Sequence, residues 1–196
     1  MNNKKNINYE SGAGFTLVEI LVVVLLITLL PAIIIADFGF IKSRFALSRT
    51  AHRFAQDLRQ TQDLSASAVS YIDEFGEVQE ISGYGIYINQ SFLGPKRYII
   101  YADNNTGNDS NGEYDGEDYI VSDVDISSFE RGVIIKEVDG MATASLSINF
   151  SPPDLKVIIS DGGVSKEVTQ VTFALEGDTA ITKTVSVNQH GLIEVK

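Results

Sequence analysis

The sequence predicts an α+β fold, in which a long N-terminal helix packs on a C-terminal antiparallel β-sheet domain. An uncharged apolar run occupies residues 20–36, apolar residues recur at helical spacing over 41–68, and period-two alternation begins after Ser70. With 196 residues and 44% hydrophobic composition, the chain can bury one core of useful size. One globular domain with a helical appendage is therefore expected.

Composition and missing motifs exclude several classes of function. The formal net charge of -11 disfavours contact with a polyanion, so no direct nucleic-acid binding is expected. The chain has no cysteine, which removes disulfides, thiolate metal sites and thiol nucleophiles. No HExxH, G-x-S-x-G, Walker or GxGxxG motif occurs, and His52 and His190 stand alone. We therefore do not expect an enzyme.

The segment from Phe15 to Ala36 has the length and apolarity of a membrane-spanning helix. At roughly 1.5 Å per residue it reaches about 30 Å, the thickness of a hydrocarbon core. Lys4 and Lys5 precede the segment, so the positive-inside rule predicts a single pass with a cytoplasmic N-terminus. Glu19 is unusual there, because an ionisable group costs roughly 2.5–3.5 kcal/mol near mid-bilayer.

Two ordinary kinds of segment fit these features incompletely. A secretory signal has a shorter apolar region of about 7–15 residues and ends at a small-x-small site, whereas bulky Ile34 stands where a small residue is needed. A plain signal anchor fits the length but leaves Glu19 without a role.

Gly14, Phe15 and Glu19, followed by the apolar run, resemble the class III signal of type IV pilins and type II secretion pseudopilins. The resemblance implies that a prepilin peptidase cuts after Gly14 and methylates the amine of Phe15. Glu19 would then act in assembly as the fifth residue of the mature chain. The implied life cycle begins in the inner membrane, in contact with lipid, and ends in an extracytoplasmic filament of pilin or pseudopilin subunits. An assembly ATPase and a platform protein are the further implied partners.

The expected organisation has four parts. They are a leader at 1–14, a transmembrane and assembly helix at 15–37, an amphipathic helix at 38–70 and a β-rich extracytoplasmic domain at 71–196. The apolar stripe expected to face the sheet comprises Ile41, Phe45, Ala51, Phe54, Ala55, Leu58 and Leu64.

Alternating apolar residues predict antiparallel strands in the C-terminal domain, around 84–88, 146–150 and 171–175. Turns are expected at 161–163, between strands over 155–160 and 164–175, and at 188–191, between strands over 184–187 and 192–195. Residues 53–63, 148–152, and 185–188 together with 191–193, are similar to GspH/FimT-like minor pilins, which implies a minor rather than a major subunit. A pilus, a type II secretion system and a DNA-uptake system all remain open as the machine served.

An acidic stretch without Lys or Arg lies between Ala102 and Glu130. Calcium uses about six to eight oxygen ligands on such a flexible backbone. The candidate ligands are Asp103, Asp109, Asn111, Glu113 and Asp115. The spacing of the last three resembles an EF-type loop, but position twelve is Ser122 rather than a bidentate glutamate.

Two alternatives follow from this stretch. The loop can be acidic, solvated and unligated, so no cofactor is certain. The rival function is a membrane-anchored extracytoplasmic enzyme or binding domain that keeps its leader and uses the acidic loop as its site.

Overall fold

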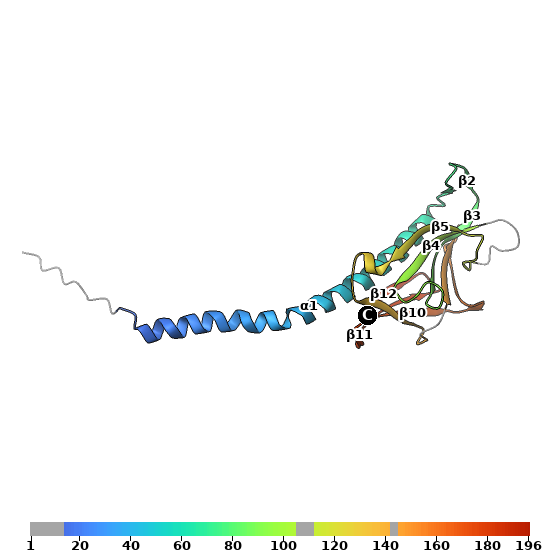
Figure 1. The fold of residues 1–196 in the computed structure, drawn as a ribbon. Coiled ribbons are helices and arrows are strands. Elements are labelled where there is room, and N and C mark those ends of the chain that lie inside the picture. Colours follow the sequence, from blue (N-terminus) through green and yellow to red (C-terminus); the bar gives the residue numbers. More distant parts are fainter. Residues whose placement is uncertain (1–13, 105–111, 142–144) are drawn as a thin grey trace, which may run out of the picture. The chain divides into compact units, whose positions relative to one another are not determined.

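The computed structural model describes residues 14–104, 112–141 and 145–196, without the side chains of residues 33, 34, 36 and 37. The chain divides into two compact units, Met1–Ile41 and Lys42–Lys196. We call the second the folded unit. Figure 1 draws the elements in chain order.

The helix α1 (Leu17–Ala66) begins directly after a side-chain cap. The hydroxyl oxygen of Thr16 accepts a hydrogen bond from the backbone N–H of Glu19 at 3.2 Å, as an N-cap residue does for the third helical position. The helix ends at Ala66, and Ala68 beyond it has a φ of 46°, the left-handed conformation common after a C-terminus.

No helix within the described ranges is long and apolar enough to cross a membrane. The membrane-spanning helix predicted at 15–37 is therefore not confirmed by the structure.

Strands are the commonest elements of the folded unit, and a short 3₁₀ helix, η1 (Ile126–Ser128), lies between the fifth and sixth of them. The strands are β1 (Tyr71–Ile72), β2 (Val78–Gln79), β3 (Ile81–Asn89), β4 (Arg97–Asn104), β5 (Tyr119–Asp125), β6 (Val133–Val138), β7 (Ser145–Ser151), β8 (Lys156–Asp161), β9 (Val164–Ser165), β10 (Val168–Leu175), β11 (Asp178–Asn188) and β12 (Ile193–Val195).

The described strands form three antiparallel sheets. The largest has the order β5-β4-β3-β7-β8-β9, the second has the order β12-β11-β10-β6, and β1 and β2 form a small hairpin. Ile86 in the centre of the largest sheet is opposite Ile100 on one side and Ile148 on the other. Apolar residues therefore line up across three neighbouring strands, with Ile86 and Ile148 buried and Ile100 partly buried.

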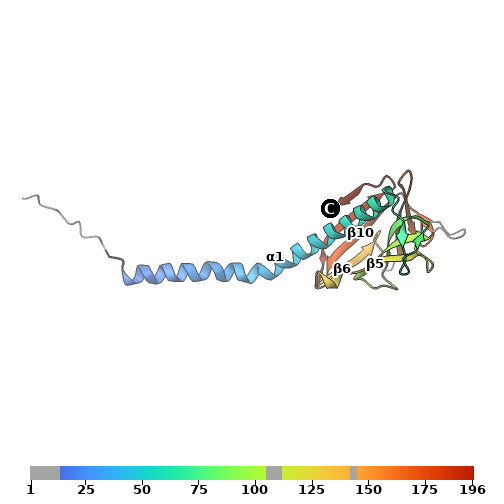
Figure 2. The ribbon, with the colours of Figure 1, turned by 90° about the horizontal axis from the view of Figure 1, so that it is seen from above.

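The part of α1 inside the folded unit packs against strands of both larger sheets. Phe54, which is fully buried, makes edge-to-face contacts with Tyr98 of β4 at 5.1 Å and with Phe173 of β10 at 5.4 Å between ring centroids. Both views show this part of the helix running beside the strands (Figures 1 and 2). The core thus forms where one helix joins the two sheets.

The predicted fold class, a long helix packed on one antiparallel sheet, is wrong. The described structure is mostly β, with twelve strands in three sheets, and the core contains α1 residues only from Ala46 to Leu58. The sequence pattern found the strands with clean alternation. It missed strands such as β4, in which consecutive residues are buried and alternation disappears.

Two local predictions also need correction. Phe45 was expected on the packed face of the helix, but its side chain is 61% exposed. It precedes Phe54 by nine residues, and a rotation of about 100° per residue places the two side chains on opposite faces of the helix. A single strand was expected over 164–175, but β9 ends at Ser165 and pairs with β8, whereas β10 belongs to the other large sheet. The turn at 188–191 does connect β11 with β12.

Candidate functional site

The predicted processing site lies at the start of α1. Residues 14–16 precede the helix and are exposed, as is Glu19 in its first turn. A Cβ added at Gly14 would meet no described atom within 4 Å, and the backbone there is not left-handed. The described fold therefore does not require glycine at position 14, so a requirement for it would come from a binding partner.

The first turns of α1 carry a large exposed apolar surface. Twelve large apolar side chains between Leu17 and Leu30 are each at least 45% exposed. Among them, Thr28 donates its hydroxyl to the carbonyl oxygens of Val24 and Leu25, both at 3.0 Å, so its polar group is satisfied within the helix. Exposed apolar area of this extent marks a surface that another molecule or a membrane covers.

The acidic stretch centres on Asp103 at the end of β4, whose side chain is only 1% exposed. One carboxylate oxygen, Oδ2, accepts hydrogen bonds from the Gly112 backbone N–H at 3.1 Å and from the Asn149 amide at 3.2 Å. The other oxygen, Oδ1, is buried and has no hydrogen-bond partner among the described atoms. Burial, reinforced by the negative charges of Asp118 and Asp115, raises the pKa of Asp103 to about 7.

The other described acids of this stretch bind protein groups. Asp118 accepts bonds from the backbone N–H groups of Asn104 at 2.9 Å and Asp115 at 3.0 Å, and burial raises its pKa. The Asp115 carboxylate accepts the backbone N–H of Glu117 at 2.7 Å, and the Glu113 carboxylate accepts the hydroxyl of Ser160.

The predicted calcium ligands are thus only partly brought together. Asp103 and Asp115 lie close enough to interact electrostatically, whereas Asp109 and Asn111 fall outside the described residues. Within the described part of the chain, no three acidic or histidine side chains are placed to hold a metal ion.

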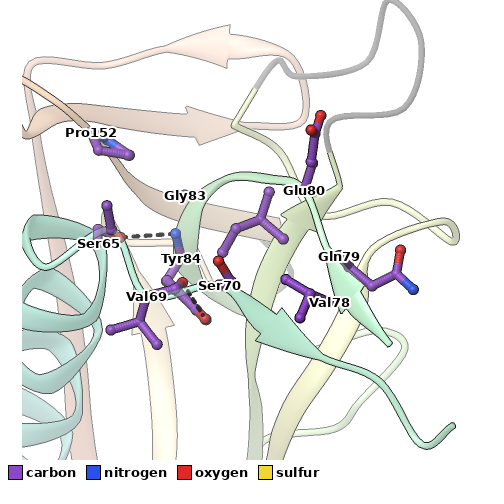
Figure 3. A pocket seen from close by; sticks show the side chains of 11 residues that line it. Ser65, Val69, Ser70, Val78, Gln79, Glu80, Gly83, Tyr84 and Pro152 are labelled. Atoms are coloured by element: carbon purple, nitrogen blue, oxygen red, sulfur yellow. Dashed lines mark hydrogen bonds between the residues drawn. The ribbon is translucent and has the colours of Figure 1, made fainter. Parts of the chain in front are cut away.

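A cavity of about 450 Å³ lies between the end of α1 and the β1–β2 hairpin (Figure 3). Inside it, the Ser65 hydroxyl oxygen accepts the backbone N–H of Tyr84 at 2.9 Å, and the Tyr84 hydroxyl donates to the Val69 carbonyl at 2.9 Å. The remaining lining includes Glu80 and Pro152 but no histidine or lysine. Ser65 therefore fastens the end of the helix to β3 through its hydroxyl oxygen.

A second hollow, of about 620 Å³, follows the outer face of α1. Phe45 forms part of it, Arg49 pairs with Glu130, and the Arg53 guanidinium lies 3.9 Å from the centroid of the Phe129 ring. We call this hollow, lined from Phe45 to Gln60 and by Phe129 and Glu130, the α1 groove.

The two histidines lie in different settings. His52 lines the α1 groove, and the backbone N–H of His190 donates to Asn188 in the turn before β12.

Comparisons with protein-family models, with curated proteins and with solved structures found no match to this chain.

Sequence reasoning missed two features that the structure provides. Thr16 and Glu19 stand three residues apart in the pattern of a capping box, which a search for helix starts could have found. The burial of Asp103 had no signal in the sequence, because a carboxylate in an acidic stretch normally faces water.

Proposed function

We propose that this chain is a structural subunit of an extracytoplasmic filament of the type IV pilus or type II secretion pseudopilus kind, cut after Gly14. The single observation that carries the proposal is the row of exposed apolar side chains from Leu17 to Leu30, which begins three residues after that glycine. Such a helix can be covered by lipid in the precursor and by like helices in a filament.

The residues around the cut support the same function. Gly14 is accessible and the described fold does not need a glycine there, which suits a peptidase that reads the residue before the bond. Cleavage would leave a positive amine on Phe15, four residues before the Glu19 carboxylate. That amine can neutralise the Glu19 of a neighbouring subunit, because an isolated charge in an apolar bundle is costly.

The proposed course starts in the inner membrane, with the N-terminus in the cytoplasm, and ends outside the cytoplasm. A prepilin peptidase, other pilin or pseudopilin subunits, a platform protein and an assembly ATPase are the proposed partners. In this proposal the chain assembles as a structural subunit and has no enzymatic activity.

The proposal is tested by the mass of the mature protein and by its presence in filaments. In cells with a prepilin peptidase, the purified chain should begin at Phe15 with one methyl group on its amine. The protein should also appear in the fraction sheared from the cell surface. Gly14→Val should leave full-length precursor, because the β-branched side chain stiffens the backbone at the bond to be cut. An unprocessed wild-type chain, or a normally processed Gly14→Val variant, would reject the proposal.

A further inference from the structure

The β1–β2 hairpin presents an apolar and acidic tip to solvent. Phe75 is 89% exposed, and Ile72 and Val78 beside it are also exposed. No Lys or Arg occurs between Arg59 and Lys96, whereas four acids lie in the hairpin region, at Asp73, Glu74, Glu77 and Glu80. An exposed aromatic ring surrounded by carboxylates fits a partner surface that is both aromatic and basic.

The hairpin tip is held in one conformation. The carboxylate of Asp73 accepts the backbone N–H groups of Phe75 at 2.9 Å and Glu77 at 2.8 Å, as well as the side-chain amide of Gln79 at 2.6 Å. At the base of the hairpin, Tyr71 stacks on Tyr119 of β5 with ring centroids 4.8 Å apart. Phe75 is therefore presented without a large ordering cost on binding.

The α1 groove has the complementary character. Phe45 and Phe129 provide aromatic surface, and Arg49 and Arg53 also line the groove, with Arg53 over the Phe129 ring. Residues 42–60 contain five Lys or Arg and one Asp, so this stretch of helix is basic although the whole chain has a formal net charge of -11. Glu130 and Asp57 offset part of the charge, and the helix retains a positive balance.

We propose that the β1–β2 hairpin of one copy docks in the α1 groove of a second copy. Phe75 enters between Phe45 and Phe129, and the flanking glutamates face the two groove arginines. A hairpin cannot fill the groove of its own chain, because His52 in the groove and Ala66 at the helix end are about 21 Å apart along the helix axis. Figure 1 shows β2 beyond that helix end.

The contact joins two different surfaces, so each docked copy leaves one hairpin and one groove available. Such head-to-tail contacts build open chains when they do not close into a ring. The inference rests on the proposed filament function, and it names a surface of the folded unit that joins neighbouring copies.

Site-specific cross-linking tests the docking in cells that express the full chain with its peptidase and assembly partners. The chain has no cysteine, so each introduced pair is unambiguous. The test variant combines Glu74→Cys, which keeps the adjacent Phe75, with His52→Cys in the groove. The matched control combines Ser91→Cys, at an exposed position outside the hairpin, with the same groove cysteine. Because a disulfide needs Cα atoms within about 7 Å, we expect roughly tenfold more cross-linked product from the test pair.

The pattern of products decides between modes of contact. Docking predicts a ladder of dimers, trimers and larger species from the double variant, and no more than dimers from each single variant. No ladder, a ladder that stops at dimers, or an equal ladder from the control pair would overturn the docking. The sheared-filament fraction of the wild-type chain is measured in parallel. If the chain is present in the sheared-filament fraction but the cross-linked ladder is absent, only the docking is rejected. If the chain is absent from that fraction, the proposed function is rejected.

Discussion

Asp103→Asn should stabilise the folded unit at alkaline pH while leaving its stability near pH 4 almost unchanged. The Asp103 side chain is buried, one of its oxygens has no described hydrogen-bond partner, and Asp118 and Asp115 place negative charge nearby. The neutral amide has the shape of the protonated acid and can accept the same bonds from Gly112 and Asn149. The substitution therefore removes a charge that the site does not accommodate well.

The sign and size of the effect follow from the pKa of Asp103, which is about 7 in the folded chain and 3.8 in its ordinary state. Because the pKa of Asp103 is higher in the folded chain than in the unfolded chain, protonation of this group stabilises the folded state. The stabilisation is fully present below about pH 3.8 and is lost as the pH rises to about 7. At about 1.4 kcal/mol per unit, the wild type loses about 4 kcal/mol over that range. Water reaching Oδ1 on ionisation would reduce the loss, so we expect the variant to gain roughly 2–4 kcal/mol at pH 8.

Urea unfolding of the full chain in detergent, followed by tyrosine circular dichroism, measures this difference at pH 4.5, 6, 7 and 8. The matched control is Asp154→Asn, which changes an exposed carboxylate in the turn between β7 and β8 and should shift stability by less than about 0.5 kcal/mol at each pH. A gain for Asp103→Asn that is the same at every pH would refute the electrostatic reasoning, as would a loss at pH 8.

Three further predictions follow from named contacts. Glu19→Ala should preserve cleavage and folding but deplete the subunit from the sheared-filament fraction on immunoblots. Glu19→Asp should be partly incorporated, because it keeps the charge. Normal incorporation of the alanine variant would reject the pairing between Glu19 and the amine of Phe15. Phe54→Ala should lower the free energy of unfolding by about 3–5 kcal/mol, because it removes a buried ring that contacts both Tyr98 and Phe173 and leaves a cavity. A loss below about 1 kcal/mol in urea unfolding would contradict the core assignment. Gly85→Ala should cost roughly 1–3 kcal/mol in the same assay, because its Cβ would overlap the buried Tyr101 ring, while the control Gly177→Ala, where no described atom lies within 4 Å and φ is not positive, should cost less.

The sequence predicted best where one physical signal acts alone. The start of the helix and the turn before β12 are set by local residues, and both lie near their predicted positions. The packed stripe was only partly correct: Phe54 and Leu58 are buried, but Phe45 is on the opposite face. Hydrophobicity alone did not separate a residue that packs in the core from one that lines an exposed groove.

The division into three sheets depends on long-range pairing that local patterns do not specify. β10 has buried residues at six of its eight positions, including consecutive ones, because it lies inside a sheet and faces α1. The acidic stretch shows the same limit. Its composition suggested a cation site, but Asp115 and Asp118 bind backbone N–H groups, which satisfy carboxylates as a cation would.

The placement of the core explains how one chain can carry both a stable domain and an exposed apolar helix. Among the described residues, the buried core cluster of the folded unit contains only residues from Ala46 onward, and the side chains from Leu17 to Leu30 are not part of that cluster. Those side chains can therefore exchange one apolar environment for another without a change in the stability of the folded unit. A subunit that moved from lipid into a bundle of helices would need this independence, because packing that held the helix against its own domain would oppose the transfer.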